Sequence, residues 1–304
     1  MYRRRMVDRA PAVGLIGTPT KRAQLLALAT EADRKGFEGI AVFGVGGGLS
    51  TCGSLAHVTT RIPFWTSIQP IYLSHPNEVA VTAGHLHEIS GGRFRLGLGV
   101  SHAPAMDGLG LSTGKPLSDM RSYVERVRGA ERAAGQLPPI WLAALRDKML
   151  ALSAEIADGA IWANPAYSYM STQLATLSAE RRATLAMSVM MPTVIDADRA
   201  AARAVLKKGL TGYLFLPNYR NYWKAAGYVD EMTAVEEALA AGQRDRLAEL
   251  MTDAWIDDCT ISGGEGEVRE RFAQWYALGV TPIAVMSSTS GGQAHAIGQL
   301  LDLY

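Results

Sequence analysis

The sequence contains few cysteines and no excess of charge of either sign. Its 304 residues include two cysteines, Cys52 and Cys259, and neither lies in a CxxC pair or at a metal-ligand spacing. We therefore expect no disulfide framework, no metal site, and a reducing, cytoplasmic compartment. The 30 lysines and arginines balance 29 aspartates and glutamates, for a formal net charge of +1, and are scattered along the chain. This balance gives no electrostatic basis for nucleic-acid binding.

Long apolar runs and several common motifs are also missing. No run approaches the roughly 18 apolar residues that span a bilayer, so no membrane contact is expected. The basic start, MYRRRMVDRA, is not followed by an apolar signal core, and we expect residues 1–10 to form a flexible arm. The glycines at 46–48 fit neither a P-loop nor a GxGxxG frame, and no GxSxG element is present.

What the sequence does contain is an alternation of strand-like and helix-like segments. Short apolar runs separated by amphipathic segments predict eight parallel strands, at residues 12–18, 38–44, 62–70, 94–100, 140–145, 159–163, 185–194 and 282–287. Helices are predicted at 21–35, 49–60, 76–89, 117–134, 148–157 and 268–278, with a helical insertion at about 196–262. This pattern predicts the α/β fold class, as one (β/α)8 TIM-barrel domain over residues 1–304.

The segment ISGGRFRLGLGVSH, residues 89–102, is the most informative. Gly91 and Gly92 predict a tight turn, and residues 94–100 alternate bulky and small side chains as a buried strand does. Ser101 and His102 follow at the strand's carboxyl end, which is where (β/α)8 barrels bind ligands. An imidazole there can donate or accept a proton near neutral pH, so His102 is the candidate acid or base. The alternatives are a surface loop histidine and an imidazole that only hydrogen-bonds the cofactor.

Five segments together resemble the bacterial luciferase-like superfamily. They are SIQPIYLSHP (67–76), SGGRFRLGLGVSH (90–102), WLAALRDKMLALSAEIADGAI (141–161), LPNYRNYWKAAGY (216–228) and GGEGEVRERFAQWYALGV (263–280). They span almost the whole chain in the family's order. The resemblance is to the branch that uses the 5-deazaflavin coenzyme F420 in place of FMN.

That resemblance implies which residues contact the cofactor ring. Family members have a non-prolyl cis peptide bond at the end of strand three, against the tricyclic ring. The matching bond here joins Ser67 and Ile68, with Gln69 next, although these residues alone fit a trans strand end equally well. Phe43 stands where many relatives carry a polar residue. Its side chain could stack on the edge of the cofactor ring, line an apolar substrate pocket, or belong to the core. Ser101 is expected to line the same site.

The resemblance also implies a phosphate site after strand five. Relatives have Gly-Pro and a basic residue there, whereas this chain continues from Ala143, Ala144 and Leu145 into Arg146, an aspartate and Lys148. The two basic side chains could bind the cofactor's phosphate at the start of the helix. The aspartate, Asp147, is expected to cap that helix.

The function implied is hydride transfer between C5 of coenzyme F420 and a small organic substrate. Reduction of a C=C or C=N bond is favoured over alcohol oxidation. The family's sugar-phosphate dehydrogenases carry an acidic residue at the matching position, where this chain has His102. The alternatives are an FMN-dependent monooxygenase and a non-catalytic cofactor-binding barrel. A homodimer is expected, and an aromatic cluster suits core or dimer packing; it comprises Tyr213, Tyr219, Tyr222 and Trp223.

Overall fold

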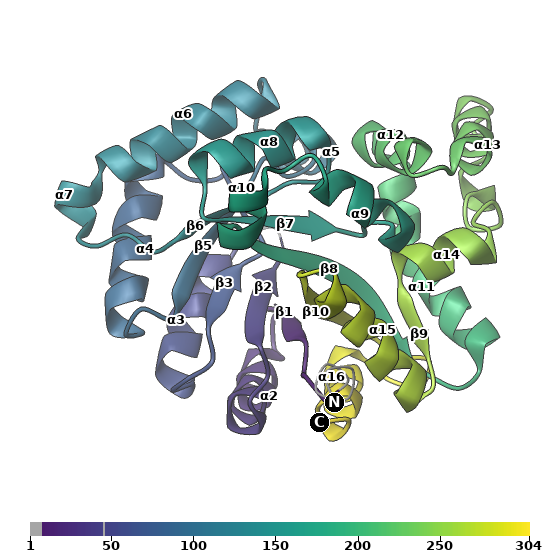
Figure 1. Ribbon diagram of the computed structural model, residues 1–304, viewed down its shortest axis with the longest axis horizontal. Coiled ribbons are helices and arrows are strands. Elements are labelled where there is room, and N and C mark those ends of the chain that lie inside the picture. Colours follow the sequence, from purple (N-terminus) through teal and green to yellow (C-terminus); the bar gives the residue numbers. More distant parts are fainter. Residues whose placement is uncertain (1–7, 45) are drawn as a thin grey trace. The chain divides into compact units, whose positions relative to one another are not determined.

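The computed structural model describes residues 8–44 and 46–304, in which strands and helices alternate along the chain (Figure 1). The fold is the predicted (β/α)8 TIM barrel with insertions. The chain divides into two compact units, which we describe separately. The first comprises residues 10–162 and 176–188, and the second comprises 163–175 and 189–304 together with the N-terminal segment. The single-domain organisation stays a prediction.

The first unit contains a parallel sheet with the strand order β1-β2-β3-β5-β6-β7, and β4 pairs with the end of β5. Its strands are β1 (Ala12–Ile16), β2 (Gly39–Phe43), β3 (Phe64–Thr66), β4 (Gln69–Pro70), β5 (Phe94–Gly99), β6 (Ile140–Ala143) and β7 (Gly159–Ala163). Its helices are α2 (Arg22–Lys35), α3 (Gly48–Val58), α4 (Pro76–Ile89), α5 (Ala103–Asp107), α6 (Pro116–Gly129), α7 (Glu131–Ala134), α8 (Asp147–Ile156) and α10 (Ala179–Thr184). Helix α4 packs against α6 and α7 (Figure 1).

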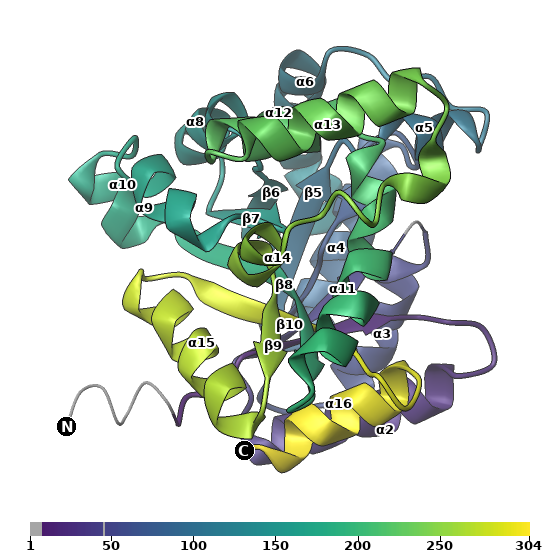
Figure 2. The same cartoon turned by 90° about the vertical axis from the view of Figure 1, so that its right-hand side faces the viewer.

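The second unit contains three parallel-sheet strands and most of the helical insertion. Its strands are β8 (Ala186–Ile195), β9 (Ile261–Gly263) and β10 (Thr281–Ser287), with β8 between the other two. Its helices are α9 (Tyr167–Leu174), α11 (Arg199–Leu214), α12 (Pro217–Ala225), α13 (Val229–Ala240), the 3-10 helix η1 (Arg244–Arg246), α14 (Asp253–Cys259), α15 (Glu265–Ala277) and α16 (Gln293–Asp302). Figure 2 shows α12 and α13 packed against each other.

The turn that leads into β5 is held by one arginine. Gly91 and Gly92 have positive φ angles of 63° and 81°, a conformation that glycine adopts at low cost. The Arg93 guanidinium then donates to the carbonyl oxygens of Ser90 and Ile62 at 2.9 and 3.1 Å, and lies 5.2 Å from the centroid of a phenylalanine ring. These bonds tie the start of β5 to the segment before β3. The strand that carries the candidate site therefore begins from a fixed point.

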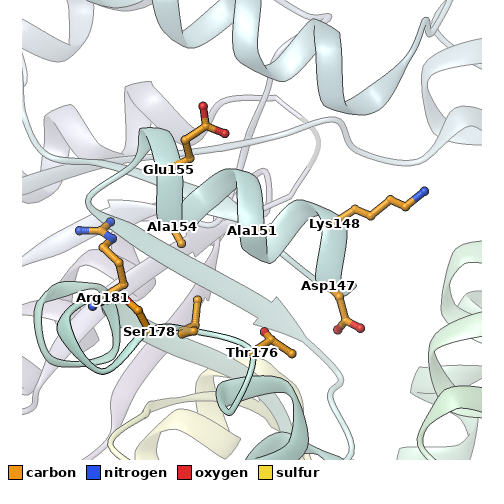
Figure 3. A pocket seen from close by; sticks show the side chains of 9 residues that line it. Asp147, Lys148, Ala151, Ala154, Glu155, Thr176, Ser178 and Arg181 are labelled. Carbon is orange, nitrogen blue, oxygen red and sulfur yellow. Dashed lines mark hydrogen bonds between the residues drawn. The ribbon is translucent and has the colours of Figure 1, made fainter.

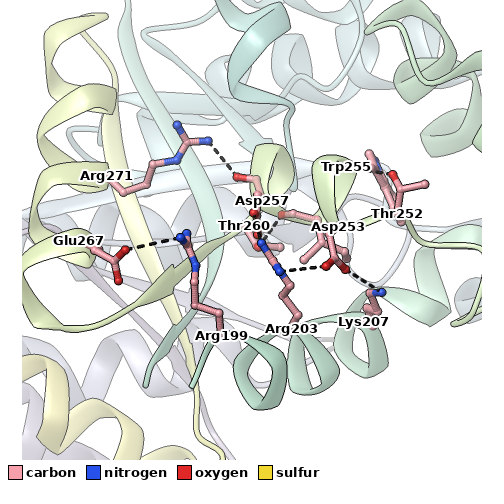
Figure 4. Close-up of polar contacts among 11 residues, drawn as sticks. Arg199, Arg203, Lys207, Thr252, Asp253, Trp255, Asp257, Thr260, Glu267 and Arg271 are labelled. Atoms are coloured by element: carbon pink, nitrogen blue, oxygen red, sulfur yellow. Dashed lines mark hydrogen bonds and ion pairs between the residues drawn. The ribbon is translucent and has the colours of Figure 1, made fainter. Parts of the chain in front are cut away.

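An ion-pair network joins α11 to α14 in the helical insertion. Arg203 donates from Nε to Asp257 at 2.9 Å and from Nη1 to Asp253 at 2.9 Å (Figure 4). Lys207 adds a contact to Asp253 at 3.2 Å. Both carboxylates, Asp253 and Asp257, lie on α14, so Arg203 joins α11 to α14 through two contacts. Residues 196–262 are mostly helical, and their end begins β9, which pairs with β8 and was not predicted.

Several other expectations need correction. The strand predicted over 62–70 is divided, because β3 ends at Thr66 and β4 begins at Gln69. The helix predicted over 117–134 ends at Gly129, where α7 takes over. Helices α5, α9, α10 and α16 were not predicted. Residues 1–7 of the expected arm lie outside the described residues. Its end is anchored, because the Arg9 guanidinium lies 4.1 Å from the Tyr276 ring centroid.

The aromatic cluster predicted for core or dimer packing lies in the core of the second unit. Trp223 is fully buried and its ring centroid is 4.7 Å from that of Trp255, while Tyr219 lies 4.9 Å from Tyr213. The homodimer stays a prediction. Across residues 8–44 and 46–304, no helix combines the length and the apolar character that crossing a membrane requires.

Candidate functional site

The predicted site residues of the first unit stand at the carboxyl ends of neighbouring strands. Phe43 ends β2, the Ser67–Ile68 pair separates β3 from β4, and Ser101 and His102 follow β5. The strand register brings these ends together, because β2 pairs with β3, β3 and β4 pair with β5, and β5 pairs with β6. The carboxyl edge of a parallel barrel sheet is its usual ligand-binding edge.

The two faces of the sheet differ sharply in side-chain size near this edge. Alternate residues of a strand point to opposite faces, so Gly97 and Gly99 share a face that Phe94, Leu96 and Leu98 do not. The register places Trp141 beside Gly97 on that face, and Ala143 follows at the end of β6. Large side chains therefore cover one face of β5, and the other face is nearly bare toward the carboxyl end.

Two indole rings fill the same face nearer the amino ends of the strands. Trp65 and Trp141 lie with ring centroids 5.1 Å apart. Each ring covers a glycine of a neighbouring strand. A β-carbon on Gly39 of β2 would lie 2.3 Å from the Trp65 ring, and one on Gly159 of β7 would lie 2.5 Å from the Trp141 ring. Indole rings therefore fill this face where the strands begin.

A bulge between β3 and β4 covers the two glycines, Gly97 and Gly99, of that face. The Ser67–Ile68 peptide bond is cis, as the family resemblance implied. Thr66 Oγ1 donates to the Gly97 carbonyl oxygen at 2.7 Å and accepts from the Gly97 amide at 3.0 Å, while Ser67 N donates to the Val42 carbonyl oxygen at 2.6 Å. These bonds fix the bulge to the strands on either side of it.

Ser101 and His102 follow β5 in different backbone conformations. Ser101 has a φ of 59°, which is uncommon for a residue other than glycine. His102 is half-buried and stands at the N-cap position of α5. Burial lowers the pKa of His102 below its usual value. The imidazole is therefore mostly neutral at pH 7, which suits it to accept a proton.

The glycine-rich loop after α5 is fastened by a tyrosine that sequence reasoning missed. Tyr72 donates its hydroxyl proton to Asp119 at 2.8 Å and accepts from the Gly114 amide at 3.3 Å. Burial, together with the neighbouring Asp119, raises the pKa of Tyr72 to about 12. Tyr72 stays protonated, so the loop between α5 and α6 is held at its end beside the candidate edge.

The comparison with known protein families now decides which family this fold represents. The model of the luciferase-like monooxygenase family matches residues 9–282. The chain belongs to this family. A Mycobacterium tuberculosis protein provisionally named a coenzyme F420-dependent oxidoreductase is 29% identical, over 76% of this chain and 81% of that protein. The 5,10-methylenetetrahydromethanopterin reductase of Archaeoglobus fulgidus is 29% identical, over 77% of this chain and 79% of that protein.

Solved structures share the fold of this luciferase-like protein. The coenzyme F420-dependent tetrahydromethanopterin reductase from Methanopyrus kandleri superposes with a TM-score of 0.74 at 17% identity, covering 96% of this chain and 97% of that one. An F420-dependent secondary alcohol dehydrogenase in complex with an F420-acetone adduct gives 0.68 at 14% identity, covering 97% and 98%. At these identities the likeness concerns the fold.

In this luciferase-like barrel, the predicted phosphate residues lie at the start of α8. Arg146 occupies the N-cap position and Lys148 lies in the first turn, and both side chains are exposed. Asp147 is the first helical residue, so the expectation that it caps α8 is wrong. Figure 3 shows that Asp147 and Lys148 extend from the helix in different directions. The carboxylate therefore does not occupy the space around the ammonium group.

An open groove of about 510 Å3 runs from this turn along α8 to the segment before α10 (Figure 3). Its lining comprises Asp147, Lys148, Ala151, Ala154, Glu155, Thr176, Leu177, Ser178 and Arg181. The charged groups of the lining balance in sign. A metal is not favoured here or elsewhere in the described ranges, which contain no group of three His, Cys, Asp or Glu side chains able to hold one.

The donor set at the start of α8 fits a phosphate group. Arg146 and Lys148 supply two cations, and the first-turn amides of a helix carry partial positive charge. Within residues 8–44 and 46–304, neither side chain is engaged in an ion pair, so both are available. The remaining predicted contacts differ in accessibility: Ala144 is fully buried with its amide bonded to the Ile161 carbonyl oxygen at 2.8 Å, whereas Leu145 is half-buried.

Proposed function

We propose that this luciferase-like protein is a coenzyme F420-dependent oxidoreductase. The observation that carries the proposal is the identity of 29% with the Mycobacterium tuberculosis and Archaeoglobus fulgidus proteins, over about three quarters of the chain. Their names state F420-dependent oxidoreduction and reduction of a methylene-pterin, respectively. The phosphate-compatible start of α8 and the cis bulge at the end of β3 support the proposal.

Each part of the site has a distinct task in this proposal. Arg146 and Lys148 hold the cofactor's phosphate, and Phe43, Ser67, Ile68, Gln69, Ser101, Ala143, Ala144 and Leu145 line the ring. When bound, coenzyme F420 supplies a hydride at C5 of its deazaflavin ring. The barrel orients the substrate and excludes water from the reacting atoms.

His102 handles the proton in this proposal. Reduction of a C=C or C=N bond adds a hydride to one atom and a proton to the other, so a group beside the substrate must deliver that proton. The imidazole of His102 can take up a proton from water and pass it on, or it can accept one in the reverse direction. A neutral imine or an unsaturated carbonyl compound fits this scheme, because its reduction takes up both a hydride and a proton.

Isotope transfer tests the reaction directly. The reduced coenzyme, deuterated at C5, is incubated with the protein and a panel of cyclic imines and α,β-unsaturated carbonyl compounds. The proposal expects one deuterium per turnover at the reduced carbon, and a rate about a hundredfold lower in the His102→Phe variant. Oxygen consumption with reduced FMN and no deuterium transfer would indicate an FMN-dependent monooxygenase instead. Tight F420 binding without turnover of any substrate class would indicate a non-catalytic barrel.

We also propose that the protein is a homodimer that acts on a small molecule. The aromatic cluster lies in the core of the second unit, so a dimer interface would lie elsewhere on the surface. Sedimentation equilibrium of the purified protein tests the stoichiometry: a mass close to twice 32.6 kDa supports a dimer, and a mass of one chain contradicts it.

A further inference from the structure

The bulge between β3 and β4 contains one residue more than the part of β5 that it faces. Three residues, 66–68, separate the last residue pair between β3 and β5 from the first pair between β4 and β5. On β5 the same two pairs are separated by residues 96 and 97 alone. An extra residue of this kind interrupts the hydrogen-bond ladder and re-aims the neighbouring side chains, and bulges are frequent beside active sites.

The Thr66 side chain takes over a hydrogen bond that its own backbone does not make. A regular ladder with the register of β3 and β5 would direct the Thr66 carbonyl oxygen to the Gly97 amide. The amide donates to Thr66 Oγ1 instead, at 3.0 Å, and Thr66 Oγ1 donates to the Gly97 carbonyl oxygen at 2.7 Å. The Thr66 carbonyl oxygen lies over the face of β5, 1.8 Å from the place of a Gly97 β-carbon. The hydroxyl therefore holds the bulge against β5.

Threonine has the chemistry and the shape that this position requires. A hydroxyl donates and accepts at a single atom, and Thr66 is 0% exposed, so both of its hydrogen bonds are shielded from solvent. Its β-branched side chain has few rotamers. The methyl carbon Cγ2 faces the start of α3, where a β-carbon on Gly48 would lie 3.5 Å away. Valine matches this shape without the hydroxyl, and serine keeps the hydroxyl without the methyl group.

The bulge that Thr66 holds carries two residues that we propose to line the cofactor ring, Ser67 and Ile68. The Ile68 side chain covers Gly99, where a β-carbon would also lie 3.2 Å from the β-carbon of Ala143, another proposed ring contact. All of these residues belong to the first unit. The position of Ile68 therefore depends on how closely the bulge approaches β5, and the Thr66 hydroxyl sets that approach.

We propose that Thr66 positions the cofactor ring without contacting it. Its hydroxyl, bound to both peptide groups of Gly97, fixes the bulge at the place where Ile68 supports the ring. This inference rests on the proposed function and deepens it by naming a positioning residue of the same site. Because Thr66 carries no charge, it affects affinity for the ring and leaves the phosphate to Arg146 and Lys148.

Two substitutions separate the hydroxyl of Thr66 from its shape. Thr66→Val removes the donor and the acceptor, and Thr66→Ser removes the methyl group only. Thr59→Val is the matched control in the same unit. Thr59 is 2% exposed, and its hydroxyl donates to the Leu55 carbonyl oxygen at 2.6 Å and accepts from Arg93 Nη1 at 2.6 Å. Near-UV circular dichroism shows whether each variant folds, and Tm compares their stabilities.

Fluorescence titrations with oxidised coenzyme F420, and with the deazaflavin fragment that lacks the phosphate, give the decisive affinities. We expect Thr66→Val to raise both Kd values by the same factor, about tenfold, because only the support of the ring changes. Thr66→Ser should keep the natural Kd within about twofold. Thr59→Val should lower the Tm as Thr66→Val does and leave both Kd values unchanged. The visible circular dichroism of the bound coenzyme should change in Thr66→Val alone.

Three results would overturn this inference alone, given a natural protein that binds the coenzyme. Unchanged Kd and spectrum in Thr66→Val would show that the hydroxyl does not position the ring. Equal weakening by Thr66→Ser would assign the effect to the methyl group, and equal weakening by Thr59→Val would assign it to lost stability. If Thr66→Val does not fold, Thr66→Cys decides, because a thiol is only a weak donor and acceptor. An unchanged Kd in that variant contradicts the inference.

Failure of the proposed function gives a different result. If the natural protein binds neither F420 nor FMN, the proposed function fails together with this inference. If it binds FMN alone, the proposed function fails, and the same comparison of Thr66→Val, Thr66→Ser and Thr59→Val with FMN decides whether Thr66 positions the ring.

Discussion

The side chain of Ile68 occupies the space that a β-carbon of Gly99 would need. An ideal β-carbon at Gly99 would lie 2.4 Å from Ile68 Cγ1 and 2.6 Å from its Cδ1. Two residues earlier on the same strand, a β-carbon at Gly97 would lie 1.8 Å from the Thr66 carbonyl oxygen. The two glycines of the LGLG segment at 96–99 therefore leave room for the bulge at the end of β3, whose backbone and side chain cross the face of β5.

Gly99→Ala should damage both folding and cofactor binding. The new methyl group has to displace Ile68, and overpacking of this kind costs about 1–3 kcal/mol of unfolding free energy. Because Ile68 lies at the candidate ring site, we also expect weaker F420 binding. Urea unfolding and a fluorescence titration measure the two effects.

A helical glycine in an open position provides the control for that variant. Gly209 in α11 has nothing within 4 Å of an added β-carbon, so Gly209→Ala should stabilise the protein by about 0.5–1 kcal/mol through helix propensity. Equal stability changes in the two variants would show that the space beside Gly99 is not restricted.

The double variant Arg146→Ala with Lys148→Ala should weaken coenzyme binding about tenfold or more, since hydrogen bonds to charged groups are lost. The remaining affinity should depend less on salt concentration than that of the natural protein, because two cations no longer attract the phosphate. Calorimetric titration at 50 and 300 mM salt measures both. Lys208→Ala, which removes an exposed cation from α11, serves as the control and should change neither quantity.

Removal of His102 should change how the free energy of unfolding depends on pH. Its pKa is lowered in the folded protein by burial, and the unfolded value is about 6.5. Below that pH the unfolded chain binds a proton that the folded chain does not. The unfolding free energy of the natural protein therefore falls as the pH drops through about 6.5 toward the folded pKa, and this contribution is absent at pH 8.

His102→Asn should accordingly lose less stability between pH 8 and pH 5.5 than the natural protein does. Urea unfolding at the two pH values gives the comparison, and each protein serves as its own reference at pH 8. Parallel losses in the two proteins would mean that burial does not lower the pKa of His102 in the folded protein.

Arg203→Ala should destabilise the helical insertion more than Arg199→Ala. Arg203 bridges Asp253 and Asp257, whereas the contact between Arg199 and Glu267 is 3.5 Å long with side chains 50% and 55% exposed. Because the Arg203 network is only partly exposed, its removal should cost about 1–2 kcal/mol, and that of Arg199 close to nothing. Chemical unfolding of both variants tests this difference, and equal effects would contradict it.

Local patterns predicted the strands well because each buried run is short and ends at a glycine, proline or charged residue. The bulge was placed only through family resemblance, since its residues suit a continuous strand and its cause lies on β5, at Gly97 and Gly99. Helix α16 did carry a readable signal, with Ile297, Leu300 and Leu301 at helical spacing. Helices α9 and α10 are short, and short helices give weak periodic signals.

The candidate site was predictable to the extent that it depends on strand ends. His102 and Phe43 follow from the rule that parallel strands present their carboxyl ends at one edge. Tyr72 does not follow from this rule, because its role depends on Asp119, which lies 47 residues further along the chain. No local pattern contains that relationship.

A paired titration with oxidised coenzyme F420 and with FMN tests the central claim most directly. Fluorescence of the ring and of the tryptophans, corrected for inner-filter effects, gives both dissociation constants for the same protein preparation. We predict saturable, tight binding of coenzyme F420 and much weaker binding of FMN. Tight binding of FMN with no measurable binding of coenzyme F420 would contradict the assignment as an F420-dependent oxidoreductase.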